Sequence, residues 1–363
     1  MPSGSSSCSH ALGRFDARLA AAFPRRSIVA SPTPVQPLEK LSRSAGGAEL
    51  WIKRDDLTNP RYGGNKPRKL EFLIGDALVR GARGLLTFGV VGSHHALATA
   101  IFGHEAGLST TAVLVKGPLH PHAVENLRRT CAEAERVLLL DVAGFPAVAS
   151  AVLGALTGGS LRTCLIPPGG SSVIGNLGYV AAAMELAEQV RAGEMPRPDY
   201  IFVPAGSLGT IAGLVTGLAL ARLETWTAGI AVLGPPSATQ GRVDSLVRRV
   251  RRRILDVAPD LKSIRTGFER FSLFFDQLGQ GYGHETEAGA RAARQMQELE
   301  GITLDTTYTA KTVAGMLDRV GQPSMRGKTV LYWHTLSSAP PPALDGPAAP
   351  LPPAFERLLA VTG

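Results

Sequence analysis

The sequence contains little cysteine and no long apolar run. Its three cysteines, Cys8, Cys131 and Cys164, are too few and too scattered for a disulfide framework or a zinc ribbon, and a reducing, cytoplasmic setting suits them best. The first ten residues are small and polar, unlike a secretory signal. No apolar stretch is long enough to span a bilayer. We therefore expect neither a disulfide-rich secreted protein nor a membrane protein.

Aromatic residues are also scarce, at 6%, whereas the formal net charge is +8. A basic chain can bind nucleic acid, so its densest basic run, Arg248–Arg253, needs an interpretation. Val247, Val250 and Ile254 recur there at helical spacing, which predicts a helix with its arginines in solvent. No aromatic residue interleaves with these arginines, as a surface that stacks bases would need. We expect no nucleic-acid partner.

The 363 residues, 44% of them hydrophobic and 19% charged, suit a globular protein large enough for two domains. Short apolar runs end in glycine-rich turns followed by helical patterns. These runs occupy residues 84–89, 111–115, 136–142, 200–203 and 229–234. The repetition predicts an α/β fold with parallel sheets covered by helices, whose ligands bind outside the carboxyl ends of the strands. The proline- and alanine-rich residues 337–363 are expected to cross the surface and end in a short helix.

The first glycine turn of interest lies within RYGGNKPRKLEFLIGDAL, residues 61–78. Pro67 is expected at the first helical position, which leaves Asn65 and Lys66 in the preceding turn. The helix dipole and some burial would lower the pKa of an amine there and make it a better nucleophile or base. Gly63–Gly64 lets the backbone approach a ligand. A surface turn with a solvated lysine is the open alternative.

A second glycine turn follows the predicted strand 200–203. Gly206, Ser207, Gly209 and Thr210 place several N–H groups and two hydroxyls at a helix N-terminus, which suits a phosphate dianion. Neither a P-loop nor a dinucleotide fingerprint is present, and a tight turn with ordinary capping stays possible. A reactive lysine and a site for one phosphate, without a nucleotide signature, suggest pyridoxal phosphate.

Eight segments spread over most of the chain carry a more specific signal. They are WIKRDDL, GGNKPRKLEFLIGDAL, GVVGSHHALATA, PPGGSSVIGNLGYVAAAMEL, PAGSLGTIAG, GQGYGHETEAG, LDTTYTAKTVAGM and VLYWHT. Together they resemble the 1-aminocyclopropane-1-carboxylate (ACC) deaminase / D-cysteine desulfhydrase family of pyridoxal-phosphate enzymes. The resemblance implies a two-domain, three-layer α/β fold of the tryptophan-synthase-β-like type (fold type II), with residues 1–82 and 178–363 as the large cofactor-binding domain and 83–177 as the small one. It also implies a homodimer and a small amino-acid substrate.

The resemblance assigns catalytic roles to four residues. Lys66 resembles the lysine that forms a Schiff base with the cofactor, and Ser93 resembles the serine beside the substrate carboxylate and the reacting carbon. Tyr282 and Tyr308 resemble the two active-site tyrosines. The cofactor-binding residues that it implies are Lys66, Asn65, His94, Thr309 and the loop of Ala205, Gly206, Ser207, Leu208, Gly209 and Thr210.

Thr309 stands where the family places the partner of the pyridine nitrogen, a glutamate in the deaminase branch and a threonine in the desulfhydrase branch. A hydroxyl makes the ring a weaker electron sink, which favours elimination of a good β leaving group. We therefore expect α-proton abstraction and β-elimination that release ammonia and a 2-oxo acid. Ring opening and β-replacement on another amino acid are alternatives.

Two departures from the family pattern favour a further alternative, a cofactor-binding protein that has lost catalysis. The family triplet Gln-Ser-Asn reads Gly92-Ser93-His94 here, and His94 is expected to titrate near neutrality. The two glycines of the family's His-Thr-Gly-Gly are replaced by Leu336-Ser337. Cofactor binding would tolerate both changes better than the family's named reactions would.

Adjacent His94 and His95 project in different directions without a carboxylate or cysteine cluster, so no metal site is expected. Three further histidines, His104, His120 and His122, are interpreted as surface or capping residues.

Three charged residues near the lysine are given structural or accessory roles. Lys69, inside the predicted helix, is interpreted as an exposed or phosphate-facing charge. Asp55 and Asp56 follow an arginine in a strand-to-turn segment, and we expect them to form a salt bridge and cap the turn.

Overall fold

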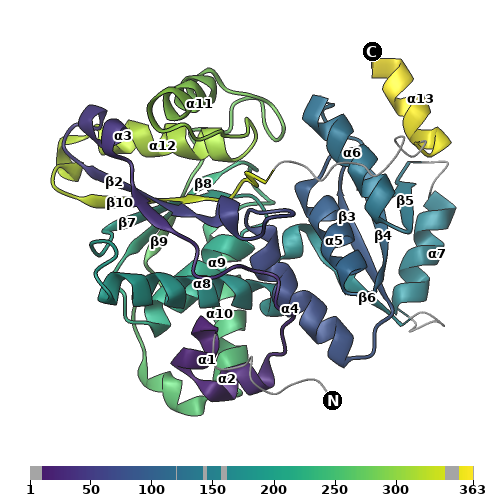
Figure 1. Cartoon of the computed structure of the whole chain (residues 1–363), viewed down its shortest axis with the longest axis horizontal. Coiled ribbons are helices and arrows are strands. Elements are labelled where there is room, and N and C mark those ends of the chain that lie inside the picture. The colour runs from purple at the N-terminus through teal and green to yellow at the C-terminus, as the bar shows by residue number, and fades with distance from the viewer. Residues whose placement is uncertain (1–9, 120, 142–144, 157–161, 340–350, 363) are drawn as a thin grey trace.

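Two β-sheets, each covered by helices, organise the chain (Figure 1). The structure is a computed structural model that describes residues 10–119, 121–141, 145–156, 162–339 and 351–362. The strands of the larger sheet come from the N-terminal and C-terminal parts of the chain, and the strands of the smaller sheet come from the segment between these parts. The predicted α/β fold with parallel-rich sheets is confirmed.

The larger sheet has the strand order β1-β2-β10-β7-β8-β9 within the described ranges. Its strands are β1 (Val35–Pro37), β2 (Glu49–Arg54), β10 (Thr329–His334), β7 (Tyr200–Ala205), β8 (Trp226–Ala231) and β9 (Phe271–Phe274). All neighbours run parallel except β1 and β2. The carboxyl ends of β2, β7 and β10 therefore meet at one edge of the sheet, where chemistry is expected.

Helices cover both faces of this sheet because successive strand side chains point to opposite sides. The described helices of this part are α1 (Ala11–Phe15), α2 (Ala17–Ala22), α3 (Glu39–Ser44), α4 (Lys66–Val79), α8 (Val173–Arg191), α9 (Gly209–Leu220), α10 (Gln240–Leu255), α11 (Glu287–Glu300) and α12 (Thr309–Val320). In β10, Val330 and Tyr332 pack with α12 and α11, whereas Leu331 and Trp333 pack with α8 and α9. In Figure 1, α3, α11 and α12 lie on one side of the sheet and α8, α9 and α10 on the other.

The smaller sheet is fully parallel, with the order β5-β4-β3-β6. Its strands are β3 (Gly84–Val90), β4 (Ser109–Val115), β5 (Arg136–Leu139) and β6 (Thr163–Ile166), and its helices are α5 (His94–Glu105), α6 (Pro121–Glu133) and α7 (Phe145–Leu156). Ala112 and Leu114 of β4 pack toward α5 and α6, whereas Val113 packs toward Val148 of α7. The same alternation therefore produces a second three-layer unit.

The last helix, α13 (Pro353–Thr362), confirms the short C-terminal helix that the sequence predicts. It packs on the smaller sheet's side of the molecule, where Phe355 is fully buried beside Leu127 and Leu139. Residues 340–350 of the proline-rich stretch lie outside the described residues. The division at residues 177 and 178 stays a prediction; that point falls inside α8.

The predicted helix α10 is confirmed, with a small correction. Val247, Val250 and Ile254 are buried as expected. The arginines occupy the other face, but Arg251 and Arg253 are only partly exposed because their guanidinium groups lie over aromatic rings.

The predicted helix α4 is confirmed as well. The helical spacing of its apolar residues would place Leu78 in the core, but Leu78 is 36% exposed because the helix ends one residue later at the surface.

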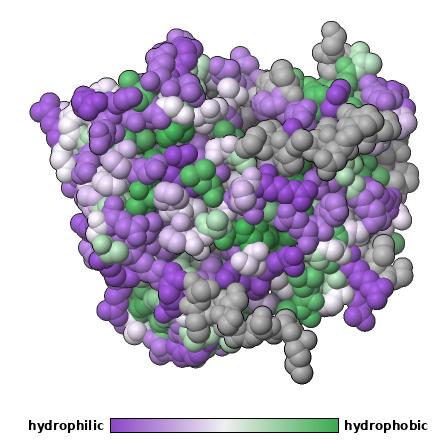
Figure 2. All heavy atoms as spheres, viewed as in Figure 1, coloured by the Kyte–Doolittle hydropathy of each residue, from purple (hydrophilic) through white to green (hydrophobic). Residues whose placement is uncertain are grey.

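The surface agrees with this arrangement of buried apolar faces. On the face shown in Figure 2, hydrophilic residues predominate and hydrophobic ones form small patches between them. Across the described residues, no helix is both long and apolar enough to cross a membrane.

Candidate active site

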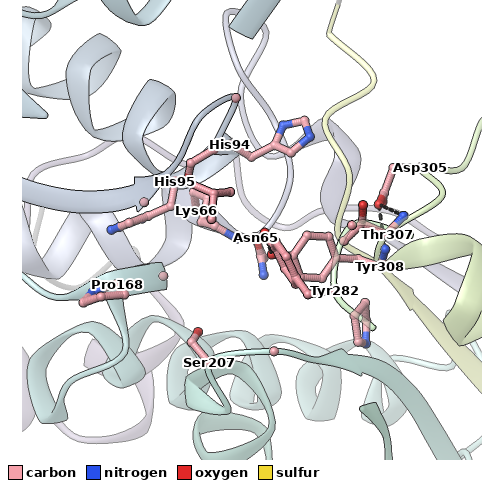
Figure 3. A pocket seen from close by; sticks show the side chains of 18 of the residues that line it. Asn65, Lys66, His94, His95, Pro168, Ser207, Tyr282, Asp305, Thr307 and Tyr308 are labelled. Carbon is pink, nitrogen blue, oxygen red and sulfur yellow. Dashed lines mark hydrogen bonds between the residues drawn. The ribbon is translucent and has the colours of Figure 1, made fainter. Parts of the chain in front are cut away.

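A cavity of about 420 Å³ lies at the carboxyl ends of strands from both sheets. It brings together segments that are far apart in the sequence: the start of α4, the β3–α5 turn, the β7–α9 turn and the loops before and after α11 (Figure 3). Ten of the predicted site residues line it: Asn65, Lys66, Ser93, His94, Gly206, Ser207, Leu208, Thr210, Tyr282 and Tyr308. Ala205, Gly209 and Thr309 are buried beside these residues without lining the cavity.

Lys66 is the first residue of α4, with Asn65 as its N-cap. Pro67 is therefore the second helical residue, one position later than expected, where its missing N–H is still harmless. The Lys66 Nζ donates a hydrogen bond to Asn65 Oδ1 at 2.6 Å. Burial lowers the pKa of Lys66 to about 8, although Asp305 acts in the opposite direction. An appreciable fraction of this amine is therefore uncharged and nucleophilic near neutral pH.

The turn between β7 and α9 has a tightly constrained backbone. Leu208 adopts a left-handed conformation with φ of 66°, which is strained for a residue with a side chain. A Cβ at Gly169 would lie 2.3 Å from Ser207 Oγ, so only glycine fits opposite the turn. Figure 3 shows Ser207 and Pro168 on the same side of the cavity. The N–H groups of α9 begin here, at an end that favours an anion.

Lys69 lies behind this turn, and the expectation that it could be an exposed charge is wrong. It is 1% exposed, and its Nζ donates to the Gly169 carbonyl at 3.0 Å and to Ser171 Oγ at 3.2 Å. Burial first, and then the charge of Lys66, lower the pKa of Lys69 well below its usual value. The buried side-chain amide of Asn176, beside Gly209, has no hydrogen-bond partner among the described residues. These donors, for which the described residues supply no carboxylate, suit an anionic ligand at the turn.

Tyr282 and Tyr308 form a hydroxyl pair on the opposite side of the cavity. Their oxygens are 2.6 Å apart and their rings meet edge to face at 5.7 Å. Burial raises the pKa of both phenols. Both hydroxyls therefore stay protonated at neutral pH, so that one proton is shared between the pair and the other is available to the cavity.

Ser93 is the N-cap of α5, and its Oγ accepts a hydrogen bond from Ala96 N at 3.3 Å. Gly89 makes room for it, because a Cβ there would come within 2.6 Å of the serine side chain. Ser93, His94 and His95 line the cavity, so the N-terminal end of α5 lies at it, and a helix N-terminus favours a carboxylate.

Asp305 is a cavity residue that the sequence interpretation missed. Its Oδ1 accepts from the backbone N–H groups of Thr307 and Tyr308, and its Oδ2 accepts from the Thr309 hydroxyl at 2.6 Å. The proton of the Thr309 hydroxyl is thus directed to the Asp305 carboxylate. The oxygen of the same hydroxyl accepts a hydrogen bond from the backbone N–H of Asp305. An aspartate just ahead of a helix is a capping signal that could have identified this residue.

The histidines differ from the expectations in two respects. Burial lowers the pKa of His94 to about 4, so titration near neutrality is wrong. His122 is exposed, as expected, but it also lines the cavity and stacks on His94 with ring centres 6.4 Å apart.

His104 and His95 contact other residues. His104 is exposed and pairs with Glu133, and His120 lies outside the described residues. Buried His95 contacts Thr87 Oγ through Nε2 at 3.1 Å.

The salt bridges expected of Asp55 and Asp56 are present, whereas no side-chain hydrogen bond caps the described turn. Asp56 pairs with Arg54 at 2.7 Å, and Asp55 pairs with Arg68 at 2.7 Å. Both carboxylates are buried in the short 3₁₀ turn Asp55–Leu57 that leads toward the lysine.

Comparison with known proteins agrees with this geometry. A D-cysteine desulfhydrase from Salmonella choleraesuis is 33% identical over 320 residues, which cover 86% of this chain and 94% of that protein. The crystal structure of an ACC deaminase homologue is 33% identical and has a TM-score of 0.75 over 90% of this chain and 95% of that one. Threonine deaminase isoform 2 from Solanum lycopersicum, 18% identical with a TM-score of 0.61, covers all of this chain and 95% of its own and shares the fold.

The family described as pyridoxal-phosphate dependent enzyme matches residues 27–335, which include the lysine corner, both glycine turns and the tyrosine pair. The chain therefore belongs to the pyridoxal-phosphate dependent enzymes, within the group of ACC deaminase and D-cysteine desulfhydrase.

Proposed function

We propose that this enzyme eliminates a leaving group from the β-carbon of a small amino acid, in the manner of a D-cysteine desulfhydrase. The overall change converts an amino acid with a leaving group X on its β-carbon, plus one water, into a 2-oxo acid, ammonia and HX. One observation carries the proposal: a lysine with a pKa of about 8 shares a single cavity with an anion-binding turn and a pair of protonated tyrosines.

The residues present fit pyridoxal phosphate. We propose that Lys66 holds its aldehyde carbon covalently and that Ser207, Thr210 and the first N–H groups of α9 bind its phosphate. Lys69 and the unpartnered Asn176 amide lie behind that turn and supply the positive charge and the donors that a dianion requires. When bound, this cofactor supplies an aldehyde for the amino group and an electron sink for the α-carbon.

The chain's own groups would handle the protons and the orientation. The uncharged Lys66 amine would take the α-proton at Nζ. Ser93 and the first turn of α5 would hold the substrate carboxylate, which fixes the α-carbon beside that amine. The tyrosine pair would donate a proton to the departing group, since both phenols are neutral at pH 7.

Thr309 supports elimination as the preferred reaction, because a hydroxyl group rather than a glutamate stands at this position. In the structure that hydroxyl donates to Asp305 Oδ2 and accepts from Asp305 N. To donate to an unprotonated ring nitrogen, as the proposal requires, it would turn its proton away from this carboxylate. Ring opening and β-replacement would use the same first proton transfer and therefore stay alternatives.

The test is the release of ammonia and 2-oxo acid over a panel of D- and L-amino acids that carry thiol, chloride or hydroxyl groups on the β-carbon. We expect equal amounts of both products, most rapidly with a D-amino acid whose leaving group is a thiol. Tyr308→Phe should lower the rate by about 10²–10⁴-fold if the pair acts as general acid. A yellow protein that turns over no member of the panel would instead favour a cofactor-binding protein that has lost catalysis.

A homodimer and a cytoplasmic location also stay proposals. The cysteine usage and the family resemblance support them, and light scattering of the purified enzyme would measure the oligomeric state.

A further inference from the structure

His94 replaces the asparagine of the family pattern, and Tyr62 contacts its ring. Tyr62 lies in the loop before α4 and is 5% exposed, and its hydroxyl oxygen is 2.6 Å from His94 Nδ1. The two ring centres are 6.3 Å apart. His94 is the first residue of α5, so this contact joins the loop that carries Lys66 to the turn that carries Ser93.

The position of the protons follows from counting donors and acceptors. The Tyr62 hydroxyl has one proton, and within the described part of the chain its oxygen contacts only His94 Nδ1. If Nδ1 carried a proton and donated it, the buried tyrosine proton would have no acceptor, which is unfavourable. Donation from Tyr62 to Nδ1 satisfies both groups and leaves the imidazole proton on Nε2.

Both groups keep these protonation states at neutral pH. Burial lowers the pKa of His94 to about 4 and raises the pKa of Tyr62. The charged or titratable groups that act on His94 are Asp305 ahead of α12, Lys66 on α4 and His122 on α6. Burial has the largest effect, Lys66 and His122 lower the pKa further, and only Asp305 raises it.

Because Nδ1 is occupied by Tyr62, Nε2 is the ring nitrogen that can serve a ligand. His94 lines the cavity, and no described protein group forms a hydrogen bond with Nε2. We propose that Tyr62 is a positioning residue that holds His94 as the neutral Nε2–H tautomer, so that His94 donates a hydrogen bond to an anionic oxygen bound in the cavity. This inference rests on the proposed function, which supplies two such oxygens: the phenolate of the cofactor and the carboxylate of the substrate.

The direct test is ¹⁵N NMR of the histidine-labelled holoenzyme, with His94→Asn to assign the His94 signal by difference. We expect the shifts of an Nε2–H imidazole that does not titrate above pH 5. In Tyr62→Phe the signal should move toward a mixture of tautomers. An Nδ1–H tautomer or an imidazolium at pH 7 in the unmodified holoenzyme would overturn the proposal.

The two possible acceptors give different results in Tyr62→Phe. If His94 donates to the cofactor, the absorbance maximum of the substrate-free holoenzyme shifts by several nanometres. If it donates to the substrate, that spectrum is unchanged and KM rises by about tenfold. Neither effect should occur when Tyr62→Phe is added to His94→Asn, where the pair no longer exists.

A Tyr62→Phe enzyme with an unchanged spectrum and an unchanged KM would contradict the donor role. Failure of the proposed function would show in the unmodified protein instead, which would either lack a chromophore that borohydride reduces or turn over no member of the amino-acid panel.

Discussion

Two neighbouring residues of α4, Arg68 and Lys69, show how differently this protein treats buried charge. Both are almost fully buried, with exposed fractions of 2% and 1%. Arg68 forms hydrogen bonds to the carboxylates of Asp55 and Glu185, at distances of 2.7 to 3.1 Å. Lys69, one residue later, contacts a carbonyl and a hydroxyl but no carboxylate. The helix thus directs one cation into a paired network and the other toward the cavity.

The paired network is closed by further contacts. Lys53 Nζ donates to Glu185 Oε1 at 2.6 Å, so two cations face two carboxylates. Tyr179 and Trp333 donate to Asp55 Oδ2 at 2.8 and 2.7 Å. Because each charge has its partner, this network needs no ligand and serves the fold.

The other site contains two lysines, Lys66 and Lys69, for which the described residues supply no carboxylate partner at hydrogen-bond distance. Burial lowers the pKa of both, as it does for the paired Lys53, so it is the missing carboxylate that distinguishes the two lysines from the network. The comparison teaches that an unpaired buried lysine is informative about function, whereas a buried ion pair mainly reports on structure.

The largest effect should come from breaking the paired network. Arg68→Met leaves the buried Asp55 without its cation and Glu185 with Lys53 alone, and we expect the free energy of unfolding to fall by about 3–5 kcal/mol. Urea unfolding of the cofactor-free enzyme measures it. The matched control is Arg291→Met, which removes an exposed pair with Glu287 and should change stability by less than about 0.5 kcal/mol. Equal losses in the two variants would contradict a structural role for the network.

Lys69→Met should lower the affinity for the cofactor and leave the stability of the cofactor-free enzyme unchanged, the opposite of Arg68→Met. Since no carboxylate loses a partner, we expect the cofactor-free enzyme to be as stable as the unmodified one. The apparent affinity for pyridoxal phosphate should fall by about 10–100-fold, because one charge-assisted contact is lost. Titration of the cofactor-free protein, followed by absorbance, measures it. If this variant unfolded as easily as Arg68→Met and bound cofactor normally, the distinction between the two cations would be wrong.

A smaller effect concerns the pH at which Lys66 becomes reactive. The folded pKa of about 8 lies below the usual 10.5, so the amine is uncharged above pH 8 and the rate of cofactor capture should rise with pH until then. Between pH 8 and pH 10.5, Lys66 is mostly uncharged in the folded state and protonated in the unfolded state. The unfolded state therefore binds more protons there, and the free energy of unfolding should rise with pH across this range.

Asp305→Asn sharpens this prediction, because Asp305 raises the pKa of Lys66. Its removal should move the midpoint of capture to lower pH by up to about one unit. Asp276→Asn, which changes a carboxylate paired with Arg319 outside the cavity, is the control and should leave the midpoint unchanged. A midpoint that moved upward in Asp305→Asn would contradict the assignment of this charge.

The sequence predicted the parts of the site that are local in the chain. Gly64 with its positive φ, the proline at the start of α4 and the turn after β7 are encoded within a few residues each, so their patterns could be recognised. The strands were recognised for the same reason, as short apolar runs before glycine turns.

What the sequence did not predict depends on contacts between distant segments. Tyr62 contacts a residue 32 positions away, and Lys69 contacts one 102 positions away, so neither role has a local pattern. The low pKa of His94 depends on burial that only the folded chain creates. The helix α13 was predicted but its packing was not, because Phe355 contacts a sheet more than 200 residues earlier in the chain.

The most direct test asks which buried lysine carries the cofactor. The holoenzyme is reduced with borohydride and digested, and the peptides are analysed by mass spectrometry. We predict a single pyridoxyl group on Lys66, with Lys66→Ala colourless and without the adduct. A pyridoxyl group on Lys69 or on any other lysine, or no adduct in a protein that binds pyridoxal phosphate, would contradict the account.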